Sequence, residues 1–208
     1  MPLELRILII DESAVRAAIL SEGLNDAGYT DVTIISDTRN LLRRIAELDP
    51  DVIFIDLENP NRDVLEQMFE VSRFVKRPIA MFVDQSDEQS IADAVDAGVS
   101  AYIVDGLHKN RMQPILNMTV ARFRAFSRLQ EELETTKVAL AERKTIDRAK
   151  RFLMQSQGLS EDEAYARLRS TAMKGGRRIG QVAEALLSSL DLLTPPENDD
   201  DKGTSDER

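Results

Sequence analysis

The sequence predicts an α/β protein with a doubly wound, five-stranded parallel sheet, followed by a long coiled-coil helix and a small three-helix all-α module. Five short apolar runs rich in β-branched residues recur at regular spacing, with helically spaced segments between them, and this alternation predicts the sheet. A basic segment near the C-terminus of an otherwise acidic chain predicts the separate module.

The five runs are nearly continuous in hydrophobicity, as is typical of strands buried on both faces. Segments such as the one carrying Val15, Ile19 and Leu24 have the spacing of covering helices. Strand and helix in alternation favour right-handed crossovers in one sheet. The predicted strands are Arg6–Ile10, Val32–Ser36, Val52–Ile55, Pro78–Val83 and Ala101–Val104.

Charge divides the chain. The whole sequence carries a net charge of −10. Residues 1–110 hold ten basic against twenty-one acidic side chains, whereas residues 143–178 hold ten basic against four acidic ones. The basic segment is typical of a module that binds a polyanion.

There are no cysteines in the sequence, which excludes a disulfide framework and a thiolate zinc site. No signal peptide or long apolar span is visible, so we expect a cytoplasmic protein with no membrane contact.

Acidic residues follow two of the predicted strands. Asp11 and Glu12 come after the first strand and Asp56 after the third. In a doubly wound sheet the functional crevice lies at the carboxyl ends of the strands. Neighbouring carboxylates repel one another unless a cation neutralises them, and Mg²⁺ prefers oxygen ligands. The alternative is that these acids are solvated loop residues of an acidic chain.

Residues 5–125 resemble the receiver domain of two-component response regulators, a fold shared with CheY and flavodoxin. The resemblance implies that Asp11, Glu12 and Asp56 hold Mg²⁺ and that Asp56 is the phosphoacceptor. Two positions depart from the family pattern. Val83 stands where receivers carry Ser or Thr, and Asp105 stands where they carry the Lys that pairs with the phosphoryl group. An anion there repels phosphate, so we interpret the domain as a degenerate receiver, with a vestigial metal site, controlled by protein contact.

The segment from Met112 to Leu140 carries an apolar stripe in steps of three and four residues, with Pro114 in the first turn. A helix with such a stripe must cover its apolar side, and a parallel coiled-coil homodimer through residues 111–142 does so. The alternative is that the stripe packs against the C-terminal helices of the same chain.

Glycines and a capping box divide the basic segment. Gly158 is expected to end one helix, and Ser160 with Glu163 forms a capping box for a helix from Glu161 to about Lys174. Gly175 and Gly176 then precede a third helix, expected over residues 177–190. Residues 193–208 form an acidic tail, expected to be disordered. The predicted domains are therefore residues 1–110, 111–142, 143–192 and the tail 193–208.

The basic segment resembles the ANTAR domain, a three-helix RNA-binding module of bacterial transcription antiterminators. The resemblance rests on AK at 149–150, LM at 153–154, GLSEDEAY at 158–165, LR at 168–169 and AM at 172–173. It implies recognition of hairpin-loop RNA, in which exposed bases stack on aromatic or arginine planes and basic side chains contact phosphates. Tyr165 and Met173 could equally belong to the core. The RNA-binding candidates are Lys150, Arg151, Tyr165, Arg169, Met173, Lys174, Arg177 and Arg178. Arg151 stands where the family commonly has glycine.

Together the parts resemble antitermination regulators, above all the nitrate-responsive NasT group and the AmiR type. That resemblance implies control by a sensor protein, a nitrate sensor similar to periplasmic binding proteins. A phosphorylation-responsive regulator that binds DNA is the alternative, because Gly175–Gly176 could imitate the turn of a helix-turn-helix. An enzyme of the haloacid-dehalogenase type is disfavoured, because Ser13 stands where such phosphatases have a second aspartate. We therefore expect no catalytic residue, and we assign no role to His108.

Overall fold

The computed structural model describes residues 5–58 and 60–191 of the 208-residue chain. The chain divides into two compact units, residues 1–129 and residues 130–208, each of which is described by itself. The predicted acidic tail at residues 193–208 lies outside the described residues.

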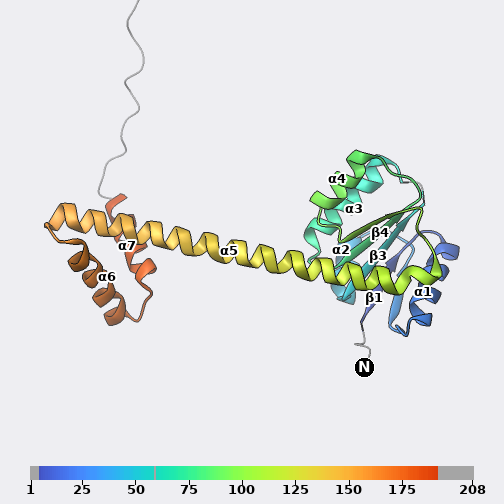
Figure 1. Ribbon diagram of the computed structural model, residues 1–208, viewed down its shortest axis with the longest axis horizontal. Coiled ribbons are helices and arrows are strands. Elements are labelled where there is room, and N and C mark those ends of the chain that lie inside the picture. Colours follow the sequence, from blue (N-terminus) through green and yellow to red (C-terminus); the bar gives the residue numbers. More distant parts are fainter. Residues whose placement is uncertain (1–4, 59, 192–208) are drawn as a thin grey trace, which may run out of the picture. The chain divides into compact units, whose positions relative to one another are not determined.

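The first unit is built on a five-stranded parallel sheet, as predicted (Figure 1), and its strand order is β2-β1-β3-β4-β5. Because the order reverses between β1 and β3, the carboxyl ends of these neighbouring strands form the switch-point crevice of a doubly wound sheet. The strands are β1 (Ile7–Ile10), β2 (Val32–Ile35), β3 (Val52–Leu57), β4 (Ile79–Val83) and β5 (Ala101–Val104).

Helices cover both faces of the sheet. One face packs against α1 (Ala14–Asp26) and the beginning of α5 (Met112–Gln157), and its core includes Leu20, Phe54 and Leu116. A short 3₁₀ helix over residues 109–111 leads into α5. The other face packs against three helices, which bury the alternate side chains of the same strands. These helices are α2 (Leu41–Leu48), α3 (Arg62–Phe74) and α4 (Glu88–Asp96).

Two expectations for the strands need correction. β2 is an edge strand, and Thr33 and Ile34 are exposed although the run was expected to be buried on both faces. An edge strand has a neighbour on one side only, so the covering helices leave part of it open. β3 is also two residues longer than expected. Asp56 therefore lies inside the strand, paired in register with Phe82 of β4, rather than after it.

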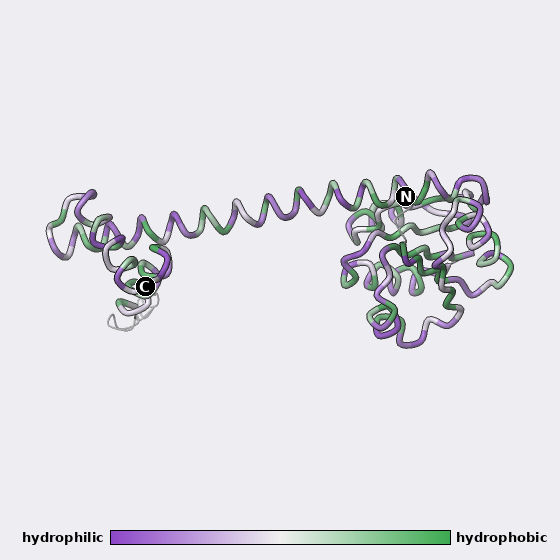
Figure 2. Tube along the Cα trace, turned by 90° about the horizontal axis from the view of Figure 1, so that it is seen from below, coloured by the Kyte–Doolittle hydropathy of each residue, from purple (hydrophilic) through white to green (hydrophobic). Residues whose placement is uncertain are grey.

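Helix α5 runs without interruption over Met112–Gln157. A boundary is predicted at residue 142, but α5 continues through it, because no Gly or Pro occurs between residues 115 and 157 to end the helix. The apolar stripe weakens at Thr136 and Lys137, yet a weaker stripe does not break a backbone made of good helix formers. Figure 2 shows hydrophobic residues recurring among hydrophilic ones along the middle of this helix.

In the second unit the end of α5 packs with α6 (Glu161–Gly175) and α7 (Ile179–Asp191). The predicted signals are confirmed. Gly158 and Gly176 adopt left-handed φ angles of 66° and 60° where α5 and α6 end, and Ser160 with Glu163 forms a capping box. α7 begins at Ile179, two residues later than expected. Leu153, Leu168 and Ala183 are among the buried residues that join the three helices.

Candidate functional site

The acidic residues predicted at the sheet edge lie in different environments. Asp11 directly follows β1 and is buried, whereas the side chain of Glu12 is exposed. Asp56 is buried in β3, with a side chain that is 0% exposed. A cavity of about 240 Å³ opens beside all three residues.

The structure adds a cation that the sequence analysis missed. Arg16, in the first turn of α1, donates from Nε to Asp56 Oδ2 and from Nη2 to Asp56 Oδ1, both at 2.7 Å. Its Nη1 lies 2.9 Å from Oδ1 of Asp84, the residue after β4. Helix α1 starts in this place because the Ser13 side chain accepts from the Arg16 amide as the N-cap. The two carboxylates raise the pKa of Arg16 above its ordinary value.

Asp11 carries unusual electrostatics. Burial raises the pKa of its carboxyl to about 6; the hydrogen bond from the Ser13 amide opposes this shift, and the nearby charge of Asp56 adds to it. Its Oδ1 accepts the Ser13 amide at 2.8 Å, while its Oδ2 is buried without a hydrogen-bond partner.

The predicted Mg²⁺ site at Asp11, Glu12 and Asp56 does not fit this arrangement. Within residues 5–58 and 60–191, no three Asp, Glu, His or Cys side chains lie close enough together to hold a metal ion. Glu12 is exposed, and both carboxylate oxygens of Asp56 accept hydrogen bonds from the guanidinium of Arg16. We therefore derive no chemistry through a metal ion here.

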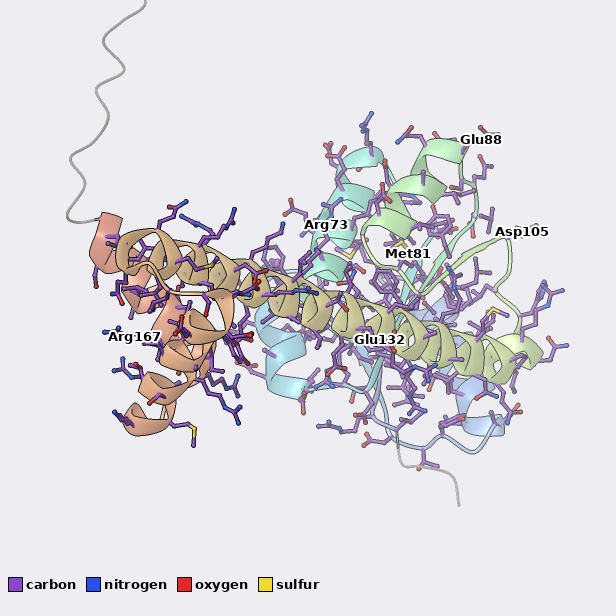
Figure 3. All side chains as sticks on the ribbon, turned by 60° about the vertical axis from the view of Figure 1, so that its left-hand side comes forward. Arg73, Met81, Glu88, Asp105, Glu132 and Arg167 are labelled. Carbon is purple, nitrogen blue, oxygen red and sulfur yellow. The ribbon has the colours of Figure 1, made fainter. Side chains whose placement is uncertain are left out.

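The two departures from the receiver pattern lie at the ends of neighbouring strands. Val83 is the buried last residue of β4 and has no hydroxyl to offer the crevice. Asp105 follows β5, is exposed, adopts a φ of 47° and donates its amide to the Val83 carbonyl at 2.9 Å. Figure 3 labels Asp105 on the loop that leaves the sheet.

In the second unit, helix α6 has one buried row, and its other positions are exposed. Ala164, Leu168 and Ala172 are buried. The residue after each of these three is exposed. These exposed residues, Tyr165, Arg169 and Met173, are also spaced four apart and form a row of their own. Tyr165 is 42% and Met173 74% exposed, so neither belongs to the core, the alternative that the sequence left open. Aromatic, guanidinium and thioether groups thus occupy successive turns of one helix face.

Lys150 differs from the other basic candidates. Its side chain is only 16% exposed, and its Nζ lies 2.8 Å from both Asp147 and Glu161. These carboxylates raise its pKa. Lys150 therefore joins α5 to the first turn of α6, and its charge is already neutralised.

The remaining basic candidates are exposed and, within the part of the chain that the structure describes, form no ion pair. They are Arg151, Arg169, Lys174, Arg177 and Arg178. Arg167 on α6 shares these properties although it was not among the predicted residues, and Figure 3 labels it among the basic side chains around that helix.

The middle of α5 leaves large apolar side chains uncovered. Phe126, Leu129, Leu133 and Leu140 are each more than half exposed. They follow the alternating steps of three and four that define a heptad seam, with Thr136 completing the series. In the described ranges, no helix combines the length and hydrophobicity that crossing a membrane requires.

Comparisons with known proteins match both units. Residues 7–117 match the response regulator receiver domain, and residues 127–187 match the ANTAR domain. A solved CheY-like receiver domain protein from Methanospirillum hungatei shares the fold of the first unit. It has a TM-score of 0.50 at 18% identity, covering 59% of this chain and 99% of that one.

Two of the relatives are regulatory proteins by name. The transcriptional regulatory protein PdtaR of Mycobacterium tuberculosis is 30% identical over 186 residues, 89% of this chain and 90% of that protein. The nitrate regulatory protein of Klebsiella oxytoca is 42% identical over 71 residues, 33% of this chain and 18% of that protein. The similarity to PdtaR extends through both units. This chain therefore belongs to the family of transcription regulators in which a response regulator receiver domain is joined to an ANTAR domain.

Proposed function

We propose that the protein is a transcription antitermination regulator that binds hairpin-loop RNA in nascent leader transcripts through its ANTAR unit. The observation that carries the proposal is the exposed row of Tyr165, Arg169 and Met173 on α6. Loop bases can stack on an aromatic ring and on a guanidinium plane, because single-stranded RNA exposes both faces of its bases. Such RNA is made in the cytoplasm, where we expect the protein to act.

The surrounding charges support the same proposal. Among the described residues, Arg151, Lys174, Arg177 and Arg178 form no ion pair, so their charges are available for phosphates. Lys150, in contrast, is held by two carboxylates, so we assign it to the stability of the unit rather than to RNA contact. We also propose that the domains of the chain are divided at residues 110, 142 and 192.

We propose that the protein acts as a homodimer through the exposed seam of α5. A seam with Phe126, Leu129, Leu133 and Leu140 open to solvent is costly for a monomer, and a second copy of the same helix would bury it. A dimer would present two ANTAR units to two hairpins of one transcript.

For regulation we propose contact with a sensor protein rather than phosphorylation. Val83 and Asp105 remove the hydroxyl and the cation that read a phosphoryl group in receivers. The name of the nitrate regulatory protein among the relatives supports nitrate as the signal. We propose that the sensor is a nitrate-binding protein similar to periplasmic binding proteins. The function proposed here includes no catalytic activity, and we assign no catalytic residue.

Binding measurements with three ligands test this function. Fluorescence anisotropy would compare a tandem small-loop hairpin RNA, the same RNA with scrambled loops, and a duplex DNA of equal length. We expect the intact loops to bind about tenfold or more tightly than either control, because only they offer the matching bases. Equal affinity for all three would reduce the basic surface to a general polyanion site. Preference for the duplex DNA would favour the DNA-binding regulator.

A further inference from the structure

The strongest unexplained feature of the first unit is the cluster of carboxylates at the carboxyl edge of the sheet. Asp11, Asp56 and Asp84 come from three neighbouring strands, β1, β3 and β4. Asp11 and Asp56 are buried, and burying two carboxylates next to each other is unfavourable without a compensating cation. With Asp105 after β5, no lysine is supplied from that strand end.

Arg16 supplies the missing charge with a geometry that matches the cluster. Its planar guanidinium uses Nε and Nη2 on the two oxygens of Asp56 and Nη1 on Asp84. Two parallel hydrogen bonds from a guanidinium to one carboxylate form the strongest arrangement available to this pair. The side chain of Arg16 is itself only 17% exposed, so solvent screens the contact weakly.

We infer that Arg16 is the resident cation of this crevice, and that its guanidinium replaces a divalent metal ion as the partner of Asp56. Phosphorylation of Asp56 requires one carboxylate oxygen to attack phosphorus while the donor's leaving group departs on the opposite side. Both oxygens are occupied by Arg16, and the side chain is closed to solvent. Asp56 is thereby withheld from metal ions and from phosphoryl donors.

A second observation concerns Asp11, which would offer an oxygen ligand if Arg16 were absent. Oδ2 of Asp11 is buried and has no hydrogen-bond partner, although the residue lines the same cavity as Asp56. With Arg16 in place, Asp56 and Asp84 are bonded to its guanidinium and no metal-binding group forms among the described residues. Removal of the guanidinium would leave Asp11, Asp56 and Asp84 without a counter-ion and free to approach one another around a divalent ion. The inference concerns the receiver unit alone and deepens the proposed control without phosphorylation. It does not rest on RNA binding, so failure of RNA binding would not affect it.

Direct metal binding tests the inference. Mn²⁺, a spectroscopic substitute for Mg²⁺, would be titrated into the full-length protein and the free ion counted by electron paramagnetic resonance. The variants are Arg16→Ala and the control Arg39→Ala, which removes an exposed ion pair with Asp37 on the surface. We expect weak binding to the wild type and the control, and binding about tenfold or more tighter to Arg16→Ala. The same affinity in all three proteins, whether weak or tight, would overturn the inference.

If Arg16→Ala does not fold, two further measurements test whether Arg16 is the partner of Asp56. In NMR spectra of the wild type, the Arg16 Nε–H should exchange slowly with solvent, and its signal should be absent from the conservative variant Arg16→Lys. Intact-mass measurement of the wild type with acetyl phosphate and Mg²⁺ should show no added phosphoryl group. A rapidly exchanging Arg16 Nε–H, or a phosphoryl group found on Asp56, would contradict the role assigned to Arg16.

Discussion

At the scale of single residues, neighbours in the sequence have opposite roles in the ANTAR unit. Leu168 is buried in the core, whereas Arg169, one residue later, is exposed. A rotation of about 100° per residue separates them on the helix. Residue type alone did not separate these roles. Tyr165 and Met173 could have been core residues, and only the packing of α6 against α5 and α7 decides that they are exposed.

The Tyr165 ring is predicted to stack on a loop base. Tyr165→Leu should weaken hairpin RNA binding by about 1–3 kcal/mol, because an aliphatic side chain cannot stack in this way. Tyr165→Phe is the matched control, since it keeps the ring, and should retain most of the affinity. Anisotropy titrations measure the affinities, and thermal melting should show little change because the side chain is 42% exposed. Equal losses in both variants would assign the effect to the hydroxyl instead.

The acidic crevice could be predicted only in part from the sequence. Strand ends gave the positions of Asp11 and Asp56, but they did not reveal Arg16, which belongs to the helix that follows β1. A signal was present: Asp11 and Asp84 follow two strands, Asp56 lies near the end of the strand between them, and Asp105 rather than a lysine directly follows the fifth, so a cation from elsewhere was required. The choice of Arg16 depends on the direction of α1, which periodicity does not give.

At the scale of elements, helix ends were predictable because their chemistry is local. The capping box at α6 is complete: Glu163 accepts from the Ser160 amide at 2.9 Å and from the Ser160 hydroxyl at 2.7 Å, while the Glu163 amide donates to that hydroxyl at 3.3 Å. The length of α5 was less predictable, because a change in the apolar stripe resembles a boundary although the backbone continues.

Loss of the capping box should destabilise the ANTAR unit. Ser160→Ala is expected to cost about 1 kcal/mol, because orphan amides at the start of α6 lose their partner. Circular dichroism during thermal unfolding measures this loss of stability.

The hydrogen bonds from the Ser160 amide and hydroxyl lower the pKa of Glu163, so the contribution of its carboxylate to the stability of the folded unit is complete at neutral pH. It should disappear as the pH falls through that lowered pKa. A Ser160→Ala effect that grows on acidification would contradict this assignment.

The exposed seam of α5 predicts a dimer whose association is weakened when a charged side chain is placed in the seam. Leu133→Lys should raise the dimer dissociation constant by about tenfold or more, because a lysine at a seam position must be buried in the dimer. Val138→Lys is the control, since Val138 is 57% exposed but lies off the seam. Sedimentation equilibrium compares the two variants with the wild type. A similar effect of both variants would show that the seam is not the interface.

At the scale of the whole molecule, charge is divided between the two parts. The chain carries −10 overall, yet residues 143–178 hold an excess of six basic side chains. RNA affinity should therefore fall steeply with salt despite the negative net charge, because counter-ions are released locally from the phosphates. For three to five phosphate contacts we expect a slope of about −2 to −4 in a plot of log affinity against log salt.

The Lys174→Gln variant sharpens the salt measurement. If Lys174 contacts one phosphate, its removal should make the slope less negative by about 0.7, with a similar effect on every RNA sequence tested. An unchanged slope in this variant would remove Lys174 from the interface, and a slope near zero in the wild type would contradict electrostatic binding altogether.

The most direct test of the central claim, that the exposed row of α6 binds RNA loops, is a calorimetric titration of hairpin RNA into three full-length proteins. These are the wild type, Arg169→Ala, and Arg124→Ala, which removes an exposed arginine of α5 outside the proposed interface. We predict that Arg169→Ala loses about tenfold or more in affinity with its melting temperature unchanged, while Arg124→Ala binds as the wild type does. Equal affinity of the wild type and Arg169→Ala for the intact hairpin would contradict the account.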